Sequence, residues 1–294
     1  MNIRPDGIYL DGTLGGAGHS YEIVRRLDKG RLIGVDRDTV ALEAASRRLK
    51  DHAHKVTTVH SNFCRIHNIL DDLGLDGIDG MLFDLGVSSP QLDDGSRGFS
   101  YMADAPLDMR MNREDPLTAA DVVNTYSQEE LKRILFTFGE ERYAPQIAAA
   151  IVRKREQKPI ETTMELVDII RSAMPAQALR EKQHPAKRSF QAIRIAVNDE
   201  LGSVEKVMKD AIPCLNPGGR LAIITFHSLE DRIVKNGMAD AAKGCTCPPS
   251  FPVCVCGKKP QVKLVTRKPI VSGDEELERN PRARSAKLRV CEKV

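Results

Sequence analysis

The sequence predicts an α/β protein, in which a parallel, doubly wound sheet is interrupted by an inserted helical domain. Near the start, a strand, a glycine-rich turn, a helix and a second strand follow one another. Further strand patterns then alternate with helical patterns, as in sheets whose parallel strands are joined by helices. Finally, the stretch between residues 85 and 220 is too long for one crossover connection and has helical periodicity. These three observations together define the expected fold class.

Each element has its own signal. Short apolar runs predict strands at residues 7–10, 31–35, 55–60, 80–85 and 220–226. Apolar spacing typical of helices occurs at residues 20–27, 127–138, 145–155, 163–173 and 190–209. Ser127, followed three residues later by Glu130, matches a capping box at a helix start. We therefore expect residues 105–188 to form the inserted helical domain, and residues 1–104 and 189–294 to form the sheet domain.

The glycine-rich turn and a downstream acid predict a site for an adenosine-containing cofactor. The turn reads DGTLGGAGH over residues 11–19, and glycine lets a ligand approach the backbone closely. Asp36 ends the second strand 18 residues after Gly18, close to the ~20 typical of an acid that accepts hydrogen bonds from ribose hydroxyls. Tyr21 occupies the position where a dinucleotide fingerprint needs a glycine or alanine. This favours S-adenosylmethionine over a nicotinamide dinucleotide, although an ordinary glycine-rich turn remains the alternative.

Length, composition and charge limit the classes of protein to which this chain can belong. At 294 residues the chain can bury a full core, and neither a membrane span nor a signal peptide is evident, so a cytosolic address is expected. Residues 258–294 carry 11 Lys and Arg against 5 Asp and Glu, whereas the rest of the chain is slightly acidic. A basic tail of this kind suits a phosphate-rich partner, or is simply a solvated tail. Residues 280–290 end in an alternation that predicts an edge strand with its basic side chains facing outward.

Polar residues follow two of the predicted strands. Asp84 ends the fourth strand and is followed by Ser88, Ser89 and Pro90, where an open sheet binds ligands. Methyltransferases that act on exocyclic amines place acceptors there, because the amine is a poor nucleophile and must be oriented. An ordinary turn is the alternative. His227 follows the fifth strand and is interpreted equally well as a substrate contact or a structural group.

The cysteines need separate interpretation. Cys214 precedes a turn and is expected to pack as a small apolar residue rather than act as a nucleophile. Four further thiols lie within twelve residues, at Cys245, Cys247, Cys254 and Cys256. Their one-residue gaps are narrower than the spacing usual for structural zinc. The sequence therefore predicts no metal, and leaves zinc at these four cysteines as the less favoured alternative to a reduced, proline-rich loop.

Taken as a whole, the chain resembles the MraW family of bacterial N4-cytosine methyltransferases of small-subunit (16S) ribosomal RNA. The resemblance runs through nearly the whole sequence, and several of its motifs are specific to this family. The matching blocks are residues 11–19, 34–38, 84–91, 97–100, 106–111, 190–198, 226–235 and 280–285. Family members also carry a segment ahead of the residues that match 2–6; without it, we expect a more open cofactor pocket.

The resemblance implies a Rossmann-like, S-adenosylmethionine-dependent methyltransferase that modifies a cytidine N4 in the decoding region of assembled small subunits. The cofactor contacts it implies are Ala17, Gly18, His19, Asp36, Phe63, Asp84 and Gln91. Candidate substrate contacts are Ser88, Ser89, Pro90, Arg194 and His227. The resemblance assigns no catalytic base. We therefore expect the enzyme to promote the reaction by positioning the flipped-out cytosine. A noncatalytic RNA-binding assembly factor is the alternative function, and the oligomeric state is left open.

Overall fold

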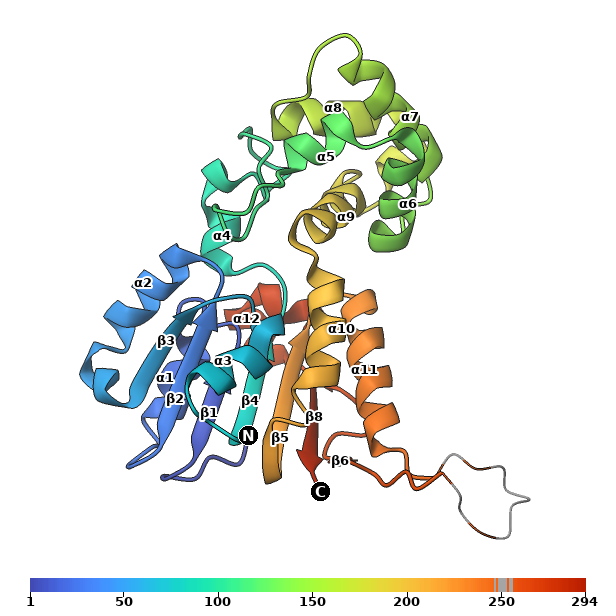
Figure 1. The fold of residues 1–294 in the computed structure, drawn as a ribbon. Helices are drawn as coiled ribbons and strands as arrows, with labels where there is room; N and C mark the ends of the chain where they lie inside the picture. Colours follow the sequence, from blue (N-terminus) through green and yellow to red (C-terminus); the bar gives the residue numbers. More distant parts are fainter. Residues whose placement is uncertain (246, 248–252, 254–255) are drawn as a thin grey trace. The chain divides into compact units, whose positions relative to one another are not determined.

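The computed structural model describes residues 1–245, 247, 253 and 256–294, which form two compact units (Figure 1). Unit 1 comprises Met1–Gly86 and Leu201–Val294, and unit 2 comprises Val87–Glu200. The second unit is therefore inserted into the first between two strands of its sheet. It extends beyond the expected residues 105–188 on both sides, because Phe99 and the helix that carries Phe190 pack into the same core as the other helices of unit 2.

Unit 1 is a mixed sheet in the order β3-β2-β1-β4-β5-β8-β6, with β7 also paired to β8. Strands β1 to β5 run parallel, and β8 runs antiparallel to β5 and β6. The strands are β1 Ile8–Asp11, β2 Arg31–Asp36, β3 Val56–His60, β4 Ile78–Asp84, β5 Leu215–Thr225, β6 Val262–Leu264, β7 Ile270–Val271 and β8 Lys287–Lys293. The prediction of a parallel, doubly wound α/β sheet is confirmed.

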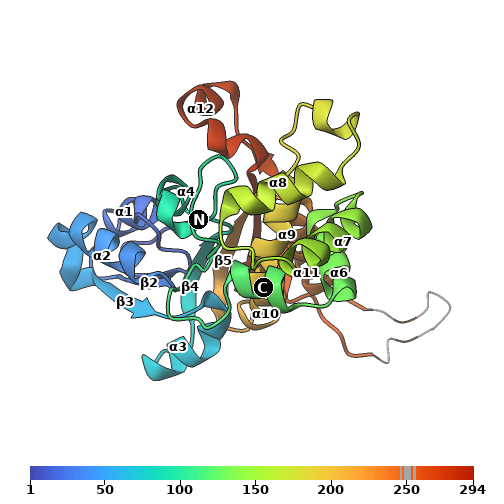
Figure 2. The same ribbon diagram turned by 90° about the horizontal axis from the view of Figure 1, so that it is seen from above.

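Two hydrophobic cores cover the two faces of this sheet, because side chains alternate between faces along each strand. On one face, Leu10 and Phe83 pack with α3, α10 and α11; on the other, Tyr9 and Leu32 pack with α1 and α2. Figure 2 shows α3 on the opposite side of the sheet from α1 and α12. The helices of this unit are α1 Gly18–Val24, α2 Thr39–Arg48, α3 Ile66–Asp72, α10 Glu200–Asp210, α11 Ser228–Ala242 and α12 Asp274–Arg279. Glu200, the first residue of α10, is the last residue of unit 2.

Unit 2 is helical and has its own core, which is drawn entirely from residues 87–200. Its helices are α4 Ser89–Asp93, α5 Ala119–Thr125, α6 Gln128–Gly139, α7 Ala144–Arg155, α8 Thr163–Ala173 and α9 Lys187–Asn198. The capping box predicted at Ser127 is confirmed: its side chain accepts from the Glu130 amide, and the Glu130 side chain accepts from the Ser127 amide. Such caps satisfy amides that have no partner within the helix.

Two expectations about these elements are wrong. The helical pattern at residues 190–209 is not one helix, because Asp199 adopts a left-handed backbone with φ of 46° and separates α9 from α10. In addition, β8 is not an edge strand, since β5 lies on one side of it and β6 and β7 on the other. Its Arg289 is buried and pairs with Asp231 of α11 at 2.7 Å, so this side chain does not face outward.

Candidate functional site

The carboxyl ends of β2, β1 and β4 carry most of the predicted cofactor residues. These three strands are neighbours in the sheet, so the ends of parallel strands meet at one edge. Asp36 is the last residue of β2, Asp84 is the last residue of β4, and the glycine turn follows β1. One edge of unit 1 therefore carries Asp36, Asp84 and the turn residues Ala17, Gly18 and His19.

The turn after β1 has the backbone that its glycines permit. Gly15 has a φ of 48°, and Ala17 has the same left-handed conformation at the N-cap of α1. Gly12 is needed for a different reason, since a side chain there would overlap the ring of Phe83. A Cβ built on Gly16 meets nothing within 4 Å, so the backbone at Gly16 is open to a ligand.

Asp36 holds this turn against the end of β2. Its Oδ2 accepts a hydrogen bond from the Gly15 amide at 2.8 Å, and its Oδ1 accepts one from the Asp38 amide at 2.9 Å. Burial raises the pKa of Asp36, and the amide hydrogen bonds partly oppose that shift. An oxygen of a carboxylate has further lone pairs, so Asp36 can still accept from the hydroxyls of a ribose.

His19 and Asp84 form a second polar pair at the same edge. His19 Nε2 lies 3.5 Å from Asp84 Oδ2, and hydrogen bonding to Asp84 raises the pKa of His19. The Asp84 amide donates to Thr13 Oγ1 at 2.6 Å, which ties β4 to the turn. Within the described residues, Asp84 Oδ1 is buried and has no hydrogen-bond partner. A buried carboxylate oxygen without a donor is suited to a ligand that brings an N–H or O–H group.

Asp11 is a polar residue at this edge that the sequence did not single out as a site residue. It ends β1, is 1% exposed, and accepts hydrogen bonds from the Ser20 hydroxyl at 2.7 Å and the Thr13 amide at 3.2 Å. Burial raises the pKa of Asp11 to about 6. Its position at a strand's carboxyl end was the available signal, and it was the same signal that indicated Asp36 and Asp84.

Phe63 and Gln91, the remaining predicted cofactor residues, lie in different units. Phe63 starts a short 3₁₀ helix after β3 and is half-buried, with its ring centroid 5.6 Å from that of Phe83. Gln91 belongs to unit 2, where its side chain accepts from the Ser88 amide at 3.0 Å. Ser88 and Gln91 together form a capping box at the start of α4, and Ser89 and Pro90 are exposed in the first turn of that helix.

The other predicted substrate residues, Arg194 and His227, have charged partners near helix ends. Arg194 makes a bidentate ion pair with Glu200, at 2.7 and 2.8 Å. His227 is the N-cap of α11, and its Nε2 lies 3.1 Å from Glu230 Oε1. Both side chains thus make helix-end contacts within their own units.

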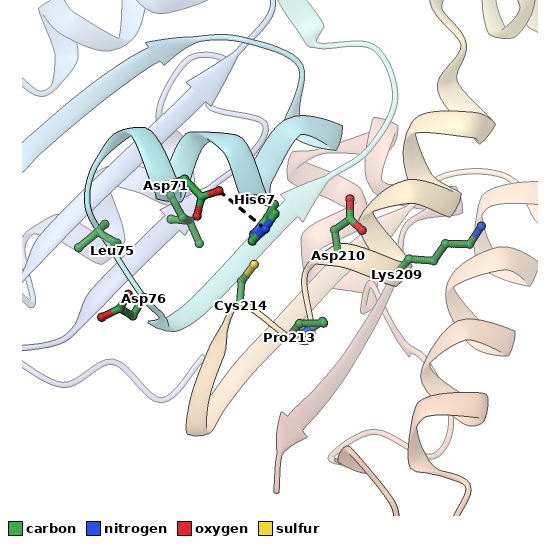
Figure 3. Close-up of a pocket in the computed structure, with 9 residues that line it drawn as sticks. His67, Asp71, Leu75, Asp76, Lys209, Asp210, Pro213 and Cys214 are labelled. Carbon is green, nitrogen blue, oxygen red and sulfur yellow. Dashed lines mark ion pairs between the residues drawn. The ribbon is translucent and has the colours of Figure 1, made fainter. Parts of the chain in front are cut away.

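The thiol of Cys214 does not have the environment of a nucleophile. The residue is 7% exposed, and burial raises the pKa of its thiol. It lines a cavity of about 400 Å³ between α3 and α10 (Figure 3). Residues 75–76 and 213–214 of this cavity directly precede β4 and β5, so it lies at the amino ends of these strands, opposite the candidate site.

Two other findings concern the cysteines and the membrane. Among the described cysteines, the sulfur atoms of Cys245, Cys247 and Cys256 all lie within 4.8 Å of one another, while Cys254 lies outside the described residues. No helix in the described part of the chain has both the length and the apolar character needed to cross a membrane.

Comparison with known proteins identifies relatives of this chain. Proteins named ribosomal RNA small subunit methyltransferase H are 58% identical in Brevibacillus brevis, 60% in Clostridium botulinum and 57% in Heliobacterium modesticaldum. Each alignment covers all of this chain and 94–95% of the relative. Among solved structures, an rRNA methylase from Streptococcus thermophilus aligns with a TM-score of 0.42 at 12% identity, over 99% of this chain and 89% of that one. The model of the MraW methylase family matches residues 1–294, and the chain therefore belongs to that family.

Proposed function

We propose that this protein transfers a methyl group from S-adenosylmethionine to N4 of a cytidine in 16S ribosomal RNA. The observation that carries the proposal is the meeting of the open glycine turn, Asp36 and Asp84 at one edge of a parallel sheet, in a chain of the MraW methylase family. The relatives' names support small-subunit ribosomal RNA as the substrate. A protein that modifies ribosomal RNA in a bacterium works in the cytoplasm.

In this proposal the edge residues of unit 1 bind the cofactor. Asp36 accepts hydrogen bonds from the ribose hydroxyls, and the open backbone at Gly16 receives the adjacent part of the ligand. His19 and Asp84 add polar contacts, and Asp84 Oδ1 takes the donor that it lacks within the described residues. Phe63 contributes an apolar surface to the adenine.

The reaction itself is a displacement at the methyl carbon. The N4 nitrogen would form the new C–N bond with its electron pair as the C–S bond breaks and S-adenosylhomocysteine leaves, and the proton released from N4 would pass to solvent water. Because the amine is conjugated with its ring, acceptors must orient it, and residues 88–90 are our candidates for that role. The target base would be unstacked to reach the cofactor, as in other enzymes that modify a base.

Basic surface on both units supports an RNA partner. Exposed basic residues occur in the last turn of α7, at Arg153 and Lys154, and after α12, at Arg282 and Arg284. Arg289 is excluded from such a surface by its burial. We propose that unit 2 and the exposed part of the tail hold RNA phosphates.

The test is transfer of labelled methyl to unmethylated small subunits, with the modified nucleoside identified by mass spectrometry. We expect N4-methylcytidine; another methylated nucleoside would overturn the assignment of the atom. Absence of transfer together with salt-dependent RNA binding and no binding of S-adenosylhomocysteine would favour a noncatalytic assembly factor instead.

A variant pair tests the cofactor site separately. Asp36→Asn removes the charge that favours hydroxyl donors, so we expect S-adenosylhomocysteine to bind about 10–100-fold more weakly, since hydrogen bonds to charged groups contribute about 1.5–3 kcal/mol. Asp210→Asn, at the opposite end of the sheet, is the matched control and should bind as the parent does. Equal affinity in both variants would refute the role of Asp36.

A further inference from the structure

The cluster formed by Cys245, Cys247 and Cys256 has no part in the methyl-transfer site described above. Its sulfur atoms lie within 4.8 Å of one another, although the first and last of these residues are 11 positions apart. Hydrophobic burial does not account for this cluster, since Cys245 and Cys256 are both exposed. Their convergence requires a different explanation.

The fold brings together the residues on either side of the cluster. Before Cys245, α11 ends at Ala242, and after Cys256, β6 begins at the buried Val262. The Gln261 amide donates to the Ala241 carbonyl at 2.8 Å, and a Cβ on Gly244 would lie 3.4 Å from the Pro260 ring. The described residues on both sides are thus in contact, which places Cys245 beside Cys256.

The spacing of the sulfur atoms matches a tetrahedral metal site. Cys245 Sγ and Cys256 Sγ are 3.7 Å apart. Four thiolates about 2.3 Å from a zinc ion stand about 3.8 Å from one another, by the geometry of a tetrahedron. A disulfide would instead require about 2.05 Å. The pair therefore lies at the separation expected for two ligands of one ion.

Local contacts favour the thiolate form that binds a metal. The Cys247 amide donates to Cys245 Sγ at 3.4 Å, and such a hydrogen bond stabilises negative charge on sulfur. Gly257 has a φ of 62°, so the chain can turn directly after the last of the three ligands.

We propose that the thiolates of Cys245, Cys247 and Cys256 bind one Zn²⁺ ion. The one-residue gaps within the cysteine pairs were the argument against zinc from sequence. That argument loses weight because the sulfur atoms of Cys245, Cys247 and Cys256 lie within 4.8 Å of one another in the fold. Binding releases the thiol protons, and because the ion binds the assembled cluster, its free energy of binding stabilises this part of the fold.

The test measures metal rather than methyl transfer. Full-length, reduced protein is equilibrated with Zn²⁺ beside a weak colorimetric chelator, and bound metal is counted after gel filtration. We expect one zinc per chain, Zn–S distances of about 2.3 Å by X-ray absorption, and a thiolate-to-metal charge-transfer band when Co²⁺ replaces Zn²⁺.

The double variant Cys245→Ser, Cys256→Ser should bind zinc at least about 100-fold more weakly, beyond the 10–100-fold lost when only an outer partner of the ligands is removed. Cys64→Ser, a half-buried thiol after β3, is the matched control and should retain the zinc. Circular dichroism confirms that both variants fold. A parent protein that binds no zinc, a double variant that retains it, or a disulfide between residues 245 and 256 in the protein as purified would each overturn the proposal.

Discussion

Replacing Asp11 by Asn should make the protein more stable at neutral pH. Burial raises the pKa of Asp11 from 3.8 to about 6, and the hydrogen bonds from Ser20 and Thr13 oppose this shift only in part. The folded state therefore binds a proton more tightly than the unfolded state does. Stability falls as the pH rises from about 4 to about 6, and the loss is complete at pH 7. The difference between the two pKa values corresponds to about 3 kcal/mol.

Asn keeps the shape and removes the charge. Its oxygen can accept from the Thr13 amide, and its NH₂ group can donate to the Ser20 hydroxyl, so at most one hydrogen bond of about 1 kcal/mol is lost. We therefore expect Asp11→Asn to raise the free energy of unfolding by about 2 kcal/mol at pH 7. At pH 4, where the native Asp11 is protonated, the gain should disappear.

Urea unfolding of parent and variant at several pH values between 4 and 7 provides the assay. The difference between the two curves isolates Asp11, because every other titrating group is common to both proteins. Ser20→Ala is the opposing control: it leaves the buried carboxylate without its hydroxyl and should lower stability by about 1–3 kcal/mol. A difference that does not change with pH would refute the assignment of the raised pKa to Asp11.

Two further perturbations separate folding from binding and test the tail. Gly12→Ala should lower stability by about 1–3 kcal/mol, because the added methyl overlaps the ring of Phe83 in β4. Gly16→Ala should change stability by no more than about 0.5 kcal/mol but weaken the binding of S-adenosylhomocysteine, as thermal unfolding and calorimetry would show. An equal loss of stability in both variants would contradict the open backbone at Gly16. Arg289→Met leaves the buried Asp231 with one fewer partner and should cost about 3 kcal/mol in urea unfolding, against at most about 1 kcal/mol for the exposed Lys263→Ala. A loss of under 1 kcal/mol for Arg289→Met would show that the ion pair is dispensable.

Much of unit 1 was predictable because its signals are local. Strands β1, β2 and β4 are short apolar runs that end in an acid, and their parallel pairing follows from the helices between them. The edge at which Asp36 and Asp84 meet could be predicted for the same reason. The Ser127 cap was likewise readable, since both partners lie within one turn of helix.

The rest depended on contacts between distant residues. Alternation in β8 shows which side chains share a face, but not that strands flank it on both sides. Arg289 was expected to face outward, because its partner Asp231 lies 58 residues away. Similarly, α9 could not be assigned to unit 2 by its apolar spacing alone, because that spacing does not say which core the helix joins. Zinc was the less favoured interpretation of the four cysteines because their one-residue gaps are narrower than usual, and the sequence does not show that the sulfur atoms of Cys245 and Cys256 lie 3.7 Å apart.

The insertion of unit 2 between β4 and β5 has a consequence for how the chain folds. Asn216 at the start of β5 bonds to Asp79 at the start of β4 across 137 residues, so this part of the sheet has a high contact order. Unit 2 draws its core from its own contiguous residues, and it can collapse without waiting for the sheet. Each doubling of the length of an unstructured loop adds about 0.6 kcal/mol to the free-energy cost of closing it.

A unit 2 that folds early replaces a long unstructured loop with a compact body, and we expect this to speed the pairing of β4 with β5. Destabilising the helical unit would then slow formation of the sheet even where no side chain of the sheet is altered.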